Sequence, residues 1–449
     1  MPAVRVAALL LVGTALLGGT ARGEDGPLPG TQLLTGPDDL SVLMMDGLHR
    51  FVERKVADAP AGRGVWWKRD FTSPEAYAVS IEANRQRLRH ILGVVDERVP
   101  ARMERCGDKE HPELVAETSR YRVYQVRWTV LDGVTGEGLW LEPKSPARAV
   151  VIAIPDADQT PEQLAGILPG VPEKSQYPRQ LANNGIGVLI PVLIDRTDEW
   201  SGHPEVAFTN QPHREWIYRQ AYHMGRHVIG YEVQKVLAAI AWLQRESADK
   251  RPIGVSGYGE GGLIALATAA LEPRVQACLV SGYFEPHAHP WEEPLYRNVF
   301  GFYREFGDAE LVSLVAPRGV VIEHSSFPQA DSPLPVKAGR KPGAALGRLT
   351  TPKFEAVKAE FDRIATLVPD KFQPRELIAG AEGATIDFGS TKAVGAVAKM
   401  LGVELKESTG DMPKVHGIPD VRARQHRQVT ELERHVQRLV RGSDAIRRK

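Results

Sequence analysis

The sequence predicts an α/β protein with a doubly wound, mostly parallel sheet, a helical N-terminal lobe and a C-terminal helix. Three observations predict this class. Continuous apolar runs recur along the chain, helical periodicity fills the segments between them, and a glycine-rich turn joins one run to an apolar helix. Alternating strands and helices with short, right-handed connections favour an open parallel sheet over other arrangements.

The composition is that of a globular protein. Of 449 residues, 43% are apolar and 25% charged, which is enough to bury one large core with smaller flanking elements. Lys+Arg and Asp+Glu both number 56, so the formal net charge is zero and no nucleic-acid partner is expected. The two cysteines, Cys106 and Cys278, lie in a polar and an apolar segment, which argues against a disulfide framework.

Residues 1–23 predict a signal peptide. An apolar stretch runs from Val6 to Gly19 after Arg5, and Ala21-Arg22-Gly23 places small residues at the two positions that signal peptidase reads. We therefore expect cleavage before Glu24 and a secreted or periplasmic protein. A membrane anchor is the alternative, but the stretch is shorter than the roughly 20 residues that span a bilayer, so no stable membrane insertion is expected. An uncleaved or lipid-attached form also stays open, although no cysteine follows the apolar stretch.

Residues 24–118 predict a mostly helical N-terminal region. Apolar residues recur at helical spacing between residues 73 and 92. These residues are Tyr77, Ile81, Leu88 and Ile91. A polar segment from Val99-Pro100 to Pro112 is expected to separate this region from the next domain, because a helix ends before a proline.

Residues 119–403 carry the strand pattern. Apolar and polar residues alternate from Tyr121 to Val130, and Asp132-Gly133 supplies the tight turn of a hairpin that returns over 137–141. The continuous apolar runs that follow are predicted strands at 149–154, 186–194, 253–256, 275–281, 319–322 and 377–379. The longest predicted helix between them spans about Glu215 to Arg245.

Residues 404–449 predict a linker and a basic amphipathic helix from Val421 to Lys449. Val429, Leu432 and Val436 recur on one face of this helix, so it should bury that face. We expect it to dock on the core of the sheet domain. The alternative is that it leads into a partner domain beyond the C-terminal helix.

A glycine-rich turn after the run at 253–256 matches the nucleophile elbow G-x-S-x-G in all but its serine. The frame is Gly257-Tyr258-Gly259-Glu260-Gly261, so the nucleophile position is Gly259, which has no side chain to attack a carbonyl. A frame centred on Ser256 fails because Tyr258 stands where the second glycine is needed, so Ser256 is a weak candidate.

The same glycines also satisfy the dinucleotide-binding pattern G-x-G-x-x-G. Such a fingerprint opens the first strand unit of its fold, whereas this one follows several earlier strands. No Lys-Ser or Lys-Thr pair follows either, which argues against a phosphate-binding loop. We therefore expect no cofactor.

The remaining members of a catalytic triad are sought after the elbow, in the order acid and then histidine. Glu323 and Asp331 follow the run at 319–322 and could hold the acid position, and His324 lies beside them. No histidine occurs between His324 and His416, where the base is needed. His223 and His227 have the i, i+4 spacing of helical metal ligands, but no H-E-x-x-H motif is present and no metal is predicted.

From Tyr121 to Leu401 the sequence resembles the α/β-hydrolase superfamily, in particular its secreted acetylxylan-esterase-like and dienelactone-hydrolase-like branches. The resemblance is carried by Val150 to Asp158, Gly230-Tyr231-Glu232-Val233, the elbow at Gly257 to Gly262, and Phe306 to Leu311 before Ala316-Pro317-Arg318. It implies that Pro155 to Asp158 lie where the second oxyanion-hole amide is found. It also implies that the backbone N–H of Glu260 would be the first such amide.

Two functions follow from this pattern. The first is a non-catalytic hydrolase-fold protein that binds a small acyl or carbohydrate ligand, because the nucleophile and the base are both missing. The second is an active ester hydrolase with displaced groups, in which Glu260 acts as a base on water and Asp156 or His324 assists. A solvated glutamate is the simpler interpretation of Glu260. The chain could also be one half of a tandem hydrolase.

Aromatic residues could line a cleft suited to sugar rings, although core packing explains them equally well. These residues are Trp200, Trp216, Tyr258, Tyr283, Phe284 and Trp291.

Overall fold

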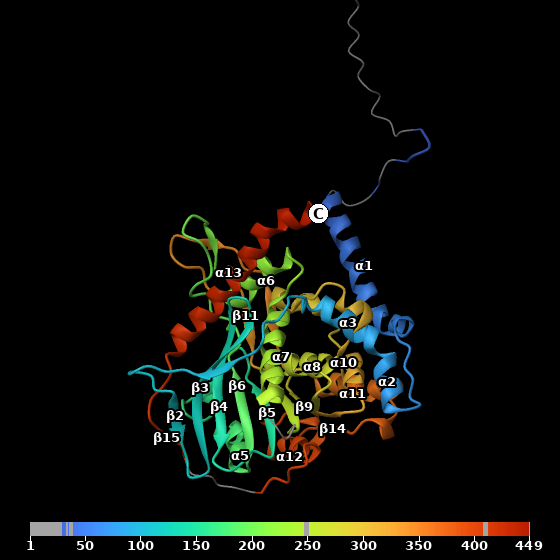
Figure 1. The fold of residues 1–449 in the computed structure, drawn as a ribbon. Coiled ribbons are helices and arrows are strands. Elements are labelled where there is room, and N and C mark those ends of the chain that lie inside the picture. Colours follow the sequence, from blue (N-terminus) through green and yellow to red (C-terminus); the bar gives the residue numbers. More distant parts are fainter. Residues whose placement is uncertain (1–28, 33–34, 36–38, 247–250, 407–411, 449) are drawn as a thin grey trace, which may run out of the picture. The chain divides into compact units, whose positions relative to one another are not determined.

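The computed structural model describes residues 29–32, 35, 39–246, 251–406 and 412–448, so the predicted signal peptide lies outside the described residues. An eleven-stranded sheet forms the centre of residues 54–449 (Figure 1). Its strands are β1 (Met103–Arg105), β2 (Leu114–Glu117), β3 (Tyr121–Leu131), β4 (Val134–Pro143), β5 (Ala149–Ile154), β6 (Ile186–Pro191), β8 (Ile253–Tyr258), β9 (Val275–Ser281), β10 (Gly319–Glu323), β14 (Arg375–Ile378) and β15 (Lys414–Val415). The short strands β7 (Phe208–Thr209), β11 (Ala330–Ser332), β12 (Lys341–Pro342) and β13 (Gly347–Leu349) form two small separate sheets.

The sheet confirms the predicted fold class. Its strand order is β14-β10-β9-β8-β5-β6-β4-β3-β2-β15, with β1 paired to β3. The strands from β14 to β6 are parallel to their neighbours, and β4 runs antiparallel to β6. The predicted hairpin of β3 and β4 turns at Asp132-Gly133, where Gly133 has a φ of 67°. β1 and β2, inside the predicted helical region, also pair with β3.

Thirteen helices are labelled along the described residues. They are α1 (Leu40–Gly62), α2 (Pro74–Ser80), α3 (Glu82–Ile91), α4 (Pro161–Leu164), α5 (Tyr177–Asn183), α6 (His213–Tyr222), α7 (Val228–Glu246), α8 (Glu260–Leu271), α9 (Phe302–Glu305), α10 (Asp308–Val315), α11 (Phe354–Leu367), α12 (Thr391–Met400) and α13 (Val421–Arg447). Short 3-10 turns supplement them, including η3 (Pro290–Glu292) and η4 (Leu295–Arg297). None of these helices is long and apolar enough to cross a membrane.

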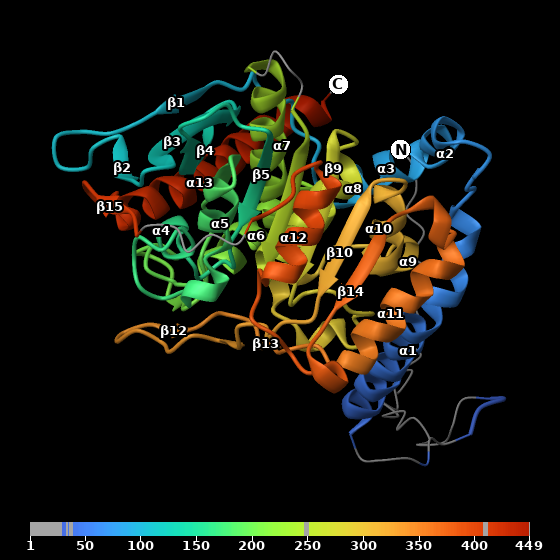
Figure 2. The same cartoon turned by 90° about the horizontal axis from the view of Figure 1, so that it is seen from below.

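The two faces of the sheet bury two separate cores. Along β5, Val150, Ile152 and Ile154 join the core formed with α7, α8 and α10, whereas Val151 and Ala153 join the core formed with α5 and α12. Successive strand residues point to opposite faces, so a strand covered on both faces must be apolar throughout. Helices accordingly flank both faces of the sheet (Figure 2).

The predicted helix over 215–245 is wrong in its continuity. α6 ends at Tyr222 and α7 begins at Val228, with Gly225 at a φ of 67° in the connection. A residue at positive φ interrupts a right-handed helix, and glycine adopts this conformation at the lowest cost.

Helix α13 docks on the sheet domain, as its apolar face predicts. Val429, Leu432 and Val436 are buried in the core on the α7 side. Asp420 caps the helix by accepting a hydrogen bond from the N–H of Ala423 at 2.9 Å. Deeper in the same interface, Arg424 donates to both carboxylate oxygens of Glu162 on α4, at 2.8 and 2.7 Å.

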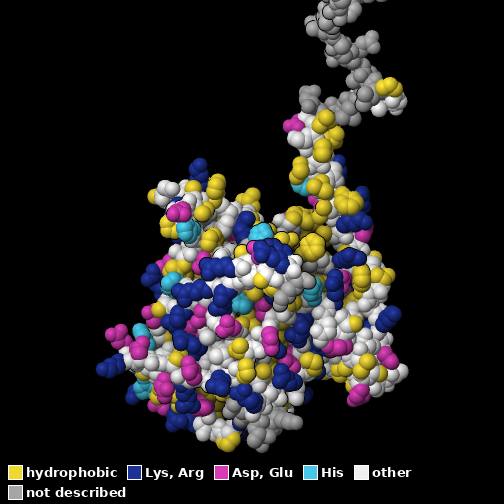
Figure 3. Space-filling model, turned by 45° about the horizontal axis from the view of Figure 1, so that its top comes forward, with side chains coloured by type: hydrophobic (Ala, Val, Ile, Leu, Met, Phe, Trp, Pro, Cys, Tyr) yellow, Lys and Arg dark blue, Asp and Glu magenta, His cyan; other side chains and the backbone are white. Residues whose placement is uncertain are grey.

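A second unit ends at Glu53, and its described residues are 29–32, 35 and 39–53. Helix α1 begins in this unit and none of its residues is buried. Its apolar side chains from Leu40 to Val52 are exposed. Elsewhere, Figure 3 shows Lys, Arg, Asp and Glu side chains interspersed over one face, in keeping with the zero net charge.

Candidate functional site

The turn from β8 into α8 has the backbone of a nucleophile elbow. Gly259, between the two elements, has φ 59° and ψ −120°. A Cβ at Gly257 would lie 1.9 Å from the carbonyl oxygen of Gly261, and one at Gly261 would lie 2.2 Å from that of Ile154. The flanking glycines therefore allow α8 to approach the ends of β8 and β5, as the motif requires.

The carboxylate of Asp156 fills the space in front of the elbow. Asp156 follows β5 and is fully buried. A Cβ on Gly259 would lie 2.4 Å from its Oδ1 atom, and the N–H of Glu260 donates to the same oxygen at 3.0 Å. In a serine hydrolase, this amide stabilises the substrate oxyanion. Here it is already bound to a carboxylate of the chain itself.

Arg196, which follows β6, holds Asp156 in place. Its Nη1 and Nη2 atoms donate to the two oxygens of Asp156 at 2.6 and 3.0 Å, a bidentate pair. Arg196 also donates to Asp158 Oδ2 at 2.9 Å and to the hydroxyl of Tyr296 at 3.0 Å. Burial alone would raise the pKa of Asp156, but Arg196 and the Glu260 N–H lower it below its usual value. Asp156 thus remains an anion.

Glu260 is buried, so the expectation of a solvated glutamate is wrong. Its Oε1 accepts from Arg297 Nε at 2.8 Å and lies 3.4 Å from Arg196 Nη2. Its Oε2 lies 3.5 Å from Arg214 Nη2. Burial acts to raise the pKa of Glu260, but the three guanidinium groups lower it to about 2. A carboxylate with so low a pKa is a weak base for activating water.

The three arginines were not identified from the sequence. Arg196 follows β6, Arg214 lies on α6, and Arg297 lies in η4, so only the tertiary fold brings them together. Arg214 is itself held by Glu232, whose two carboxylate oxygens accept at 2.8 and 2.9 Å. The sequence offered one indirect signal for Arg214. Its partner Glu232 lies in the segment Gly230 to Val233, which carries the family resemblance.

The candidates for the acid position, and His324 beside them, form hydrogen bonds and ion pairs that hold loops in place. Glu323, at the end of β10, accepts hydrogen bonds from the hydroxyl of Ser281 and from the N–H groups of Gly389 and Ser390. His324 is buried with one ring nitrogen 2.9 Å from the carbonyl oxygen of Gly383 and the other 3.0 Å from that of Pro352. Asp331 is exposed and pairs with Arg348.

The other sequence candidates are separated from the elbow turn or from each other. Ser256 is buried inside β8, where its Oγ lies 2.9 Å from the hydroxyl of Tyr177. His223 and His227 do not share a helical face, because the first caps α6 and the second precedes α7. His227 accepts from the N–H of Ile229 through Nδ1, and burial lowers its pKa to about 4.

A pocket of about 530 Å³ lies beside Arg196. It is at the edge of the sheet formed by the carboxyl ends of the parallel strands, which is also where the elbow lies. It is lined by residues that follow β5 and β6, by η4 and by the β11 segment, including Asp158, Arg196, Tyr296, Gln329, Asp331 and Ser332. A second cavity of about 450 Å³ is lined by Tyr283, Glu285, His287, His289, Glu293 and Arg297. Arg297 connects the wall of this cavity to the elbow, because it pairs with both Glu260 and Glu293.

The six aromatic residues do not form one cleft. Tyr258 is buried and stacks on Phe388 with ring centroids 3.8 Å apart, and Phe284 is in the core. Trp200 stacks on His213 and lines a third pocket beside α13, whereas Tyr283 lines the cavity around His287. Trp216 packs against the core, and Trp291 is exposed.

Residues 137–290, from β4 to η3, match the model of the dienelactone hydrolase family. A protein of Bacillus subtilis (strain 168), YtaP, described as a hydrolase, is 31% identical over 110 residues, or 23% of this chain. The match spans about a third (36%) of the length of that relative.

Solved structures include a protein described as an acetyl xylan esterase, from Bacteroides fragilis NCTC 9343. It is 14% identical, with 80% of this chain and 90% of the other covered at a TM-score of 0.49. A glucuronoyl esterase from Solibacter usitatus is 12% identical, with 74% and 94% covered at a TM-score of 0.41. The strand order, the elbow and the match over residues 137–290 make this chain an α/β-hydrolase-fold protein similar to the dienelactone hydrolase family, with glycine at the nucleophile position.

Proposed function

We propose that this chain is an exported hydrolase-fold protein of the carbohydrate-esterase-like type that binds a carbohydrate or acyl-bearing ligand without hydrolysing it at the elbow. One observation carries the proposal. The Asp156 carboxylate accepts the Glu260 N–H that would otherwise stabilise an oxyanion, and it also lies where the side chain of residue 259 would begin. An ester carbonyl therefore has neither an attacking group nor a free amide at this position.

The ion pair with Arg196 makes this blockage stable. Removing Asp156 from the elbow would leave Arg196, which is only 7% exposed, without its bidentate partner. Asp156 is itself buried, so moving its charge away from Arg196 costs free energy, which favours the carboxylate staying in place.

The pocket beside Arg196 offers a place for the ligand. Its volume of about 530 Å³ lies within the range of small-molecule sites, and its wall combines carboxylate, amide and hydroxyl groups with Pro294 and Leu334. The Asp158 side chain is 47% exposed there. Hydrogen-bonding groups beside apolar surface suit a hydroxyl-bearing ring such as a sugar.

The test combines three measurements on the purified chain. Intact mass after treatment with a fluorophosphonate probe reports an activated serine, and release of acetate from acetylated xylo-oligosaccharides reports turnover. Calorimetry with the same oligosaccharides reports binding. We expect no adduct, no turnover, and binding that Asp158→Ala weakens. Asp132→Ala, at a site 93% exposed in the hairpin turn, is the control that leaves binding unchanged.

Other outcomes contradict the proposal in distinct ways. An adduct with turnover would show a displaced serine nucleophile, of which Ser256 would be the first to map. Turnover without an adduct would favour water activated by a carboxylate such as Glu260. Failure of both assays and of oligosaccharide binding by a folded sample would reject the ligand class.

A further inference from the structure

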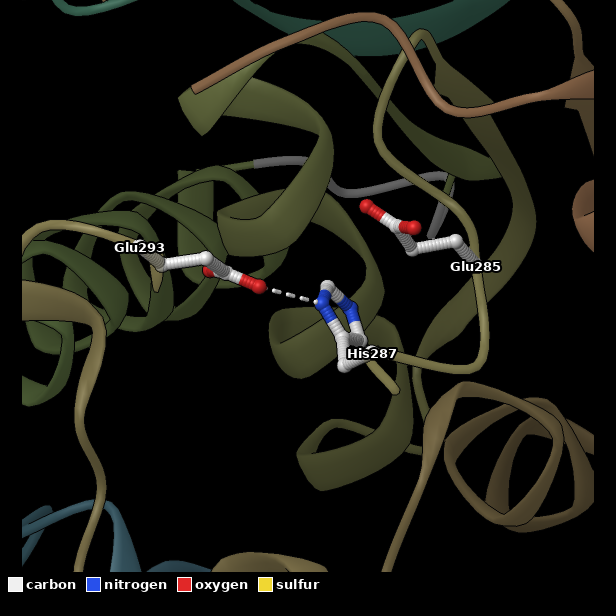
Figure 4. A group of neighbouring side chains, drawn as sticks. All are labelled: Glu285, His287 and Glu293. Carbon is white, nitrogen blue, oxygen red and sulfur yellow. Dashed lines mark hydrogen bonds and ion pairs between the residues drawn. The ribbon is translucent and has the colours of Figure 1, made fainter. Parts of the chain in front are cut away.

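Three side chains with metal-binding atoms converge at the wall of the second cavity. They are Glu285 and His287, in the segment after β9, and Glu293, just after η3 (Figure 4). One ligand atom from each residue lies within 4.8 Å of the other two. One of these contacts joins His287 Nδ1 to Glu293 Oε1 at 2.8 Å.

The opposite side of the His287 ring is fixed by Asp308. His287 Nε2 lies 3.2 Å from Asp308 Oδ2, and Asp308 is fully buried at the start of α10. A histidine that binds a metal through one nitrogen commonly donates its other N–H to a carboxylate, which sets the tautomer and the ring orientation. The bond to Asp308 would thus hold the ring with Nδ1 directed at Glu293, as a metal ligand requires.

Glu293 is oriented in the same way by its second oxygen. Its Oε2 lies 3.3 Å from Arg297 Nη1, which leaves Oε1 directed at His287. No hydrogen bond to the Glu285 carboxylate is observed among the described residues, and this side chain lines the cavity of about 450 Å³. The cavity gives an ion a route to all three donors.

We propose that Glu285, His287 and Glu293 bind a divalent transition-metal ion of the zinc type. One imidazole nitrogen with two carboxylate oxygens suits Zn²⁺ or Co²⁺ better than Ca²⁺ or Mg²⁺, which prefer oxygen ligands throughout. Three protein ligands are also the number found at zinc sites that keep one coordination position open. The site is separate from the elbow, so it does not depend on the proposed function.

Binding exchanges a proton for the metal. In the absence of the ion, an N–H at Nδ1 donates to Glu293 Oε1. The ion takes the Nδ1 lone pair and the two carboxylates, and the displaced proton passes to solvent. The positive charge of the ion is then balanced by Glu285 and Glu293, while Asp308 keeps the Nε2–H.

The test is titration of the full chain, after chelator treatment, with ZnCl₂ by calorimetry and with CoCl₂ by visible absorption. We expect one ion to bind per chain. The visible absorption of the bound Co²⁺ should be that of an ion with a low coordination number. His287→Gln and Glu285→Gln should each weaken Zn²⁺ binding by about 100-fold, and Asp308→Asn by about 10-fold or more. Glu285 is only partly buried, so Glu285→Gln keeps the test valid if the more buried variants fail to fold.

His289→Gln is the matched control. His289 lines the same cavity but is exposed, and it packs edge-on against Trp291 outside the cluster. We expect the His289→Gln variant to bind Zn²⁺ with the same affinity as the parent protein. No saturable Zn²⁺ binding, or equal loss in His289→Gln and His287→Gln, would overturn the proposal.

Discussion

Gly259 and Asp156 are too close to admit a side chain between them. The positive φ at residue 259 would strain any other residue, and a Cβ would lie 2.4 Å from Asp156 Oδ1. The two positions are therefore coupled: glycine at 259 permits the carboxylate, and the carboxylate requires the glycine. The sequence revealed the glycine, but its coupling to Asp156 depends on the ends of β5 and β8 lying side by side.

We expect Gly259→Ala to lower the free energy of unfolding by about 3 kcal/mol, the combined cost of a strained backbone and an overlapping methyl group. Gly402→Ala is the control, because Gly402 has a φ of 76° but open space around its Cβ position. It should cost only about 1–2 kcal/mol. Urea denaturation of both variants checks this. Equal losses would show that Asp156 does not restrict residue 259.

Glu260 predicts how stability depends on pH. Its pKa is about 2 in the folded chain against an ordinary 4.5, so its ionised form stabilises the fold above about pH 4.5. This contribution is lost as the pH falls from 4.5 towards 2. Glu260→Gln should cost about 3–5 kcal/mol at pH 7, because it leaves buried guanidinium groups underpaired.

Urea denaturation of the parent chain and Glu260→Gln between pH 7 and pH 3 tests this sign. We expect the two stability curves to converge at low pH, since the parent loses the contribution that the variant lacks. Parallel curves across this range would show that Glu260 has an ordinary pKa.

At the scale of elements, β5, β9 and the hairpin of β3 and β4 lie where the periodicity predicted them. The continuous apolar runs identified the strands because both faces of the parallel sheet are covered. The break between α6 and α7 was missed because the apolar spacing continues across it, and one glycine did not outweigh that pattern.

Helix α13 contributes to stability through a buried ion pair with α4. Arg424 and Glu162 are almost fully buried, so Arg424→Met should destabilise the chain by about 3–5 kcal/mol by leaving the carboxylate without its partner. Arg434→Met, at an exposed position of the same helix, should change stability by less than about 0.5 kcal/mol. Thermal denaturation of the two variants distinguishes these outcomes. A similar effect of both would show that α13 does not depend on this ion pair.

At the scale of the whole molecule, export is a prediction of the sequence alone. The apolar stretch and the small residues at Ala21 and Gly23 predict that the mature protein begins at Glu24. Intact mass of the protein recovered from the periplasm or medium of an expressing bacterium should equal that of residues 24–449. Recovery of the full mass from the cytoplasm alone would contradict the signal peptide.

The fold class, most strand positions and the loss of the nucleophile at Gly259 could be predicted from the sequence. These properties depend on local periodicity and on single residues in a recognisable turn, so a linear pattern contains them.

The group that occupies the elbow and the balance of its charges became visible only in the folded chain. Asp156, Arg196, Arg214, Glu260 and Arg297 come from five different parts of the chain. The same holds for the cluster of Glu285, His287 and Glu293 with Asp308. Electrostatic pairing depends on distance and burial, and neither can be read from spacing along the sequence.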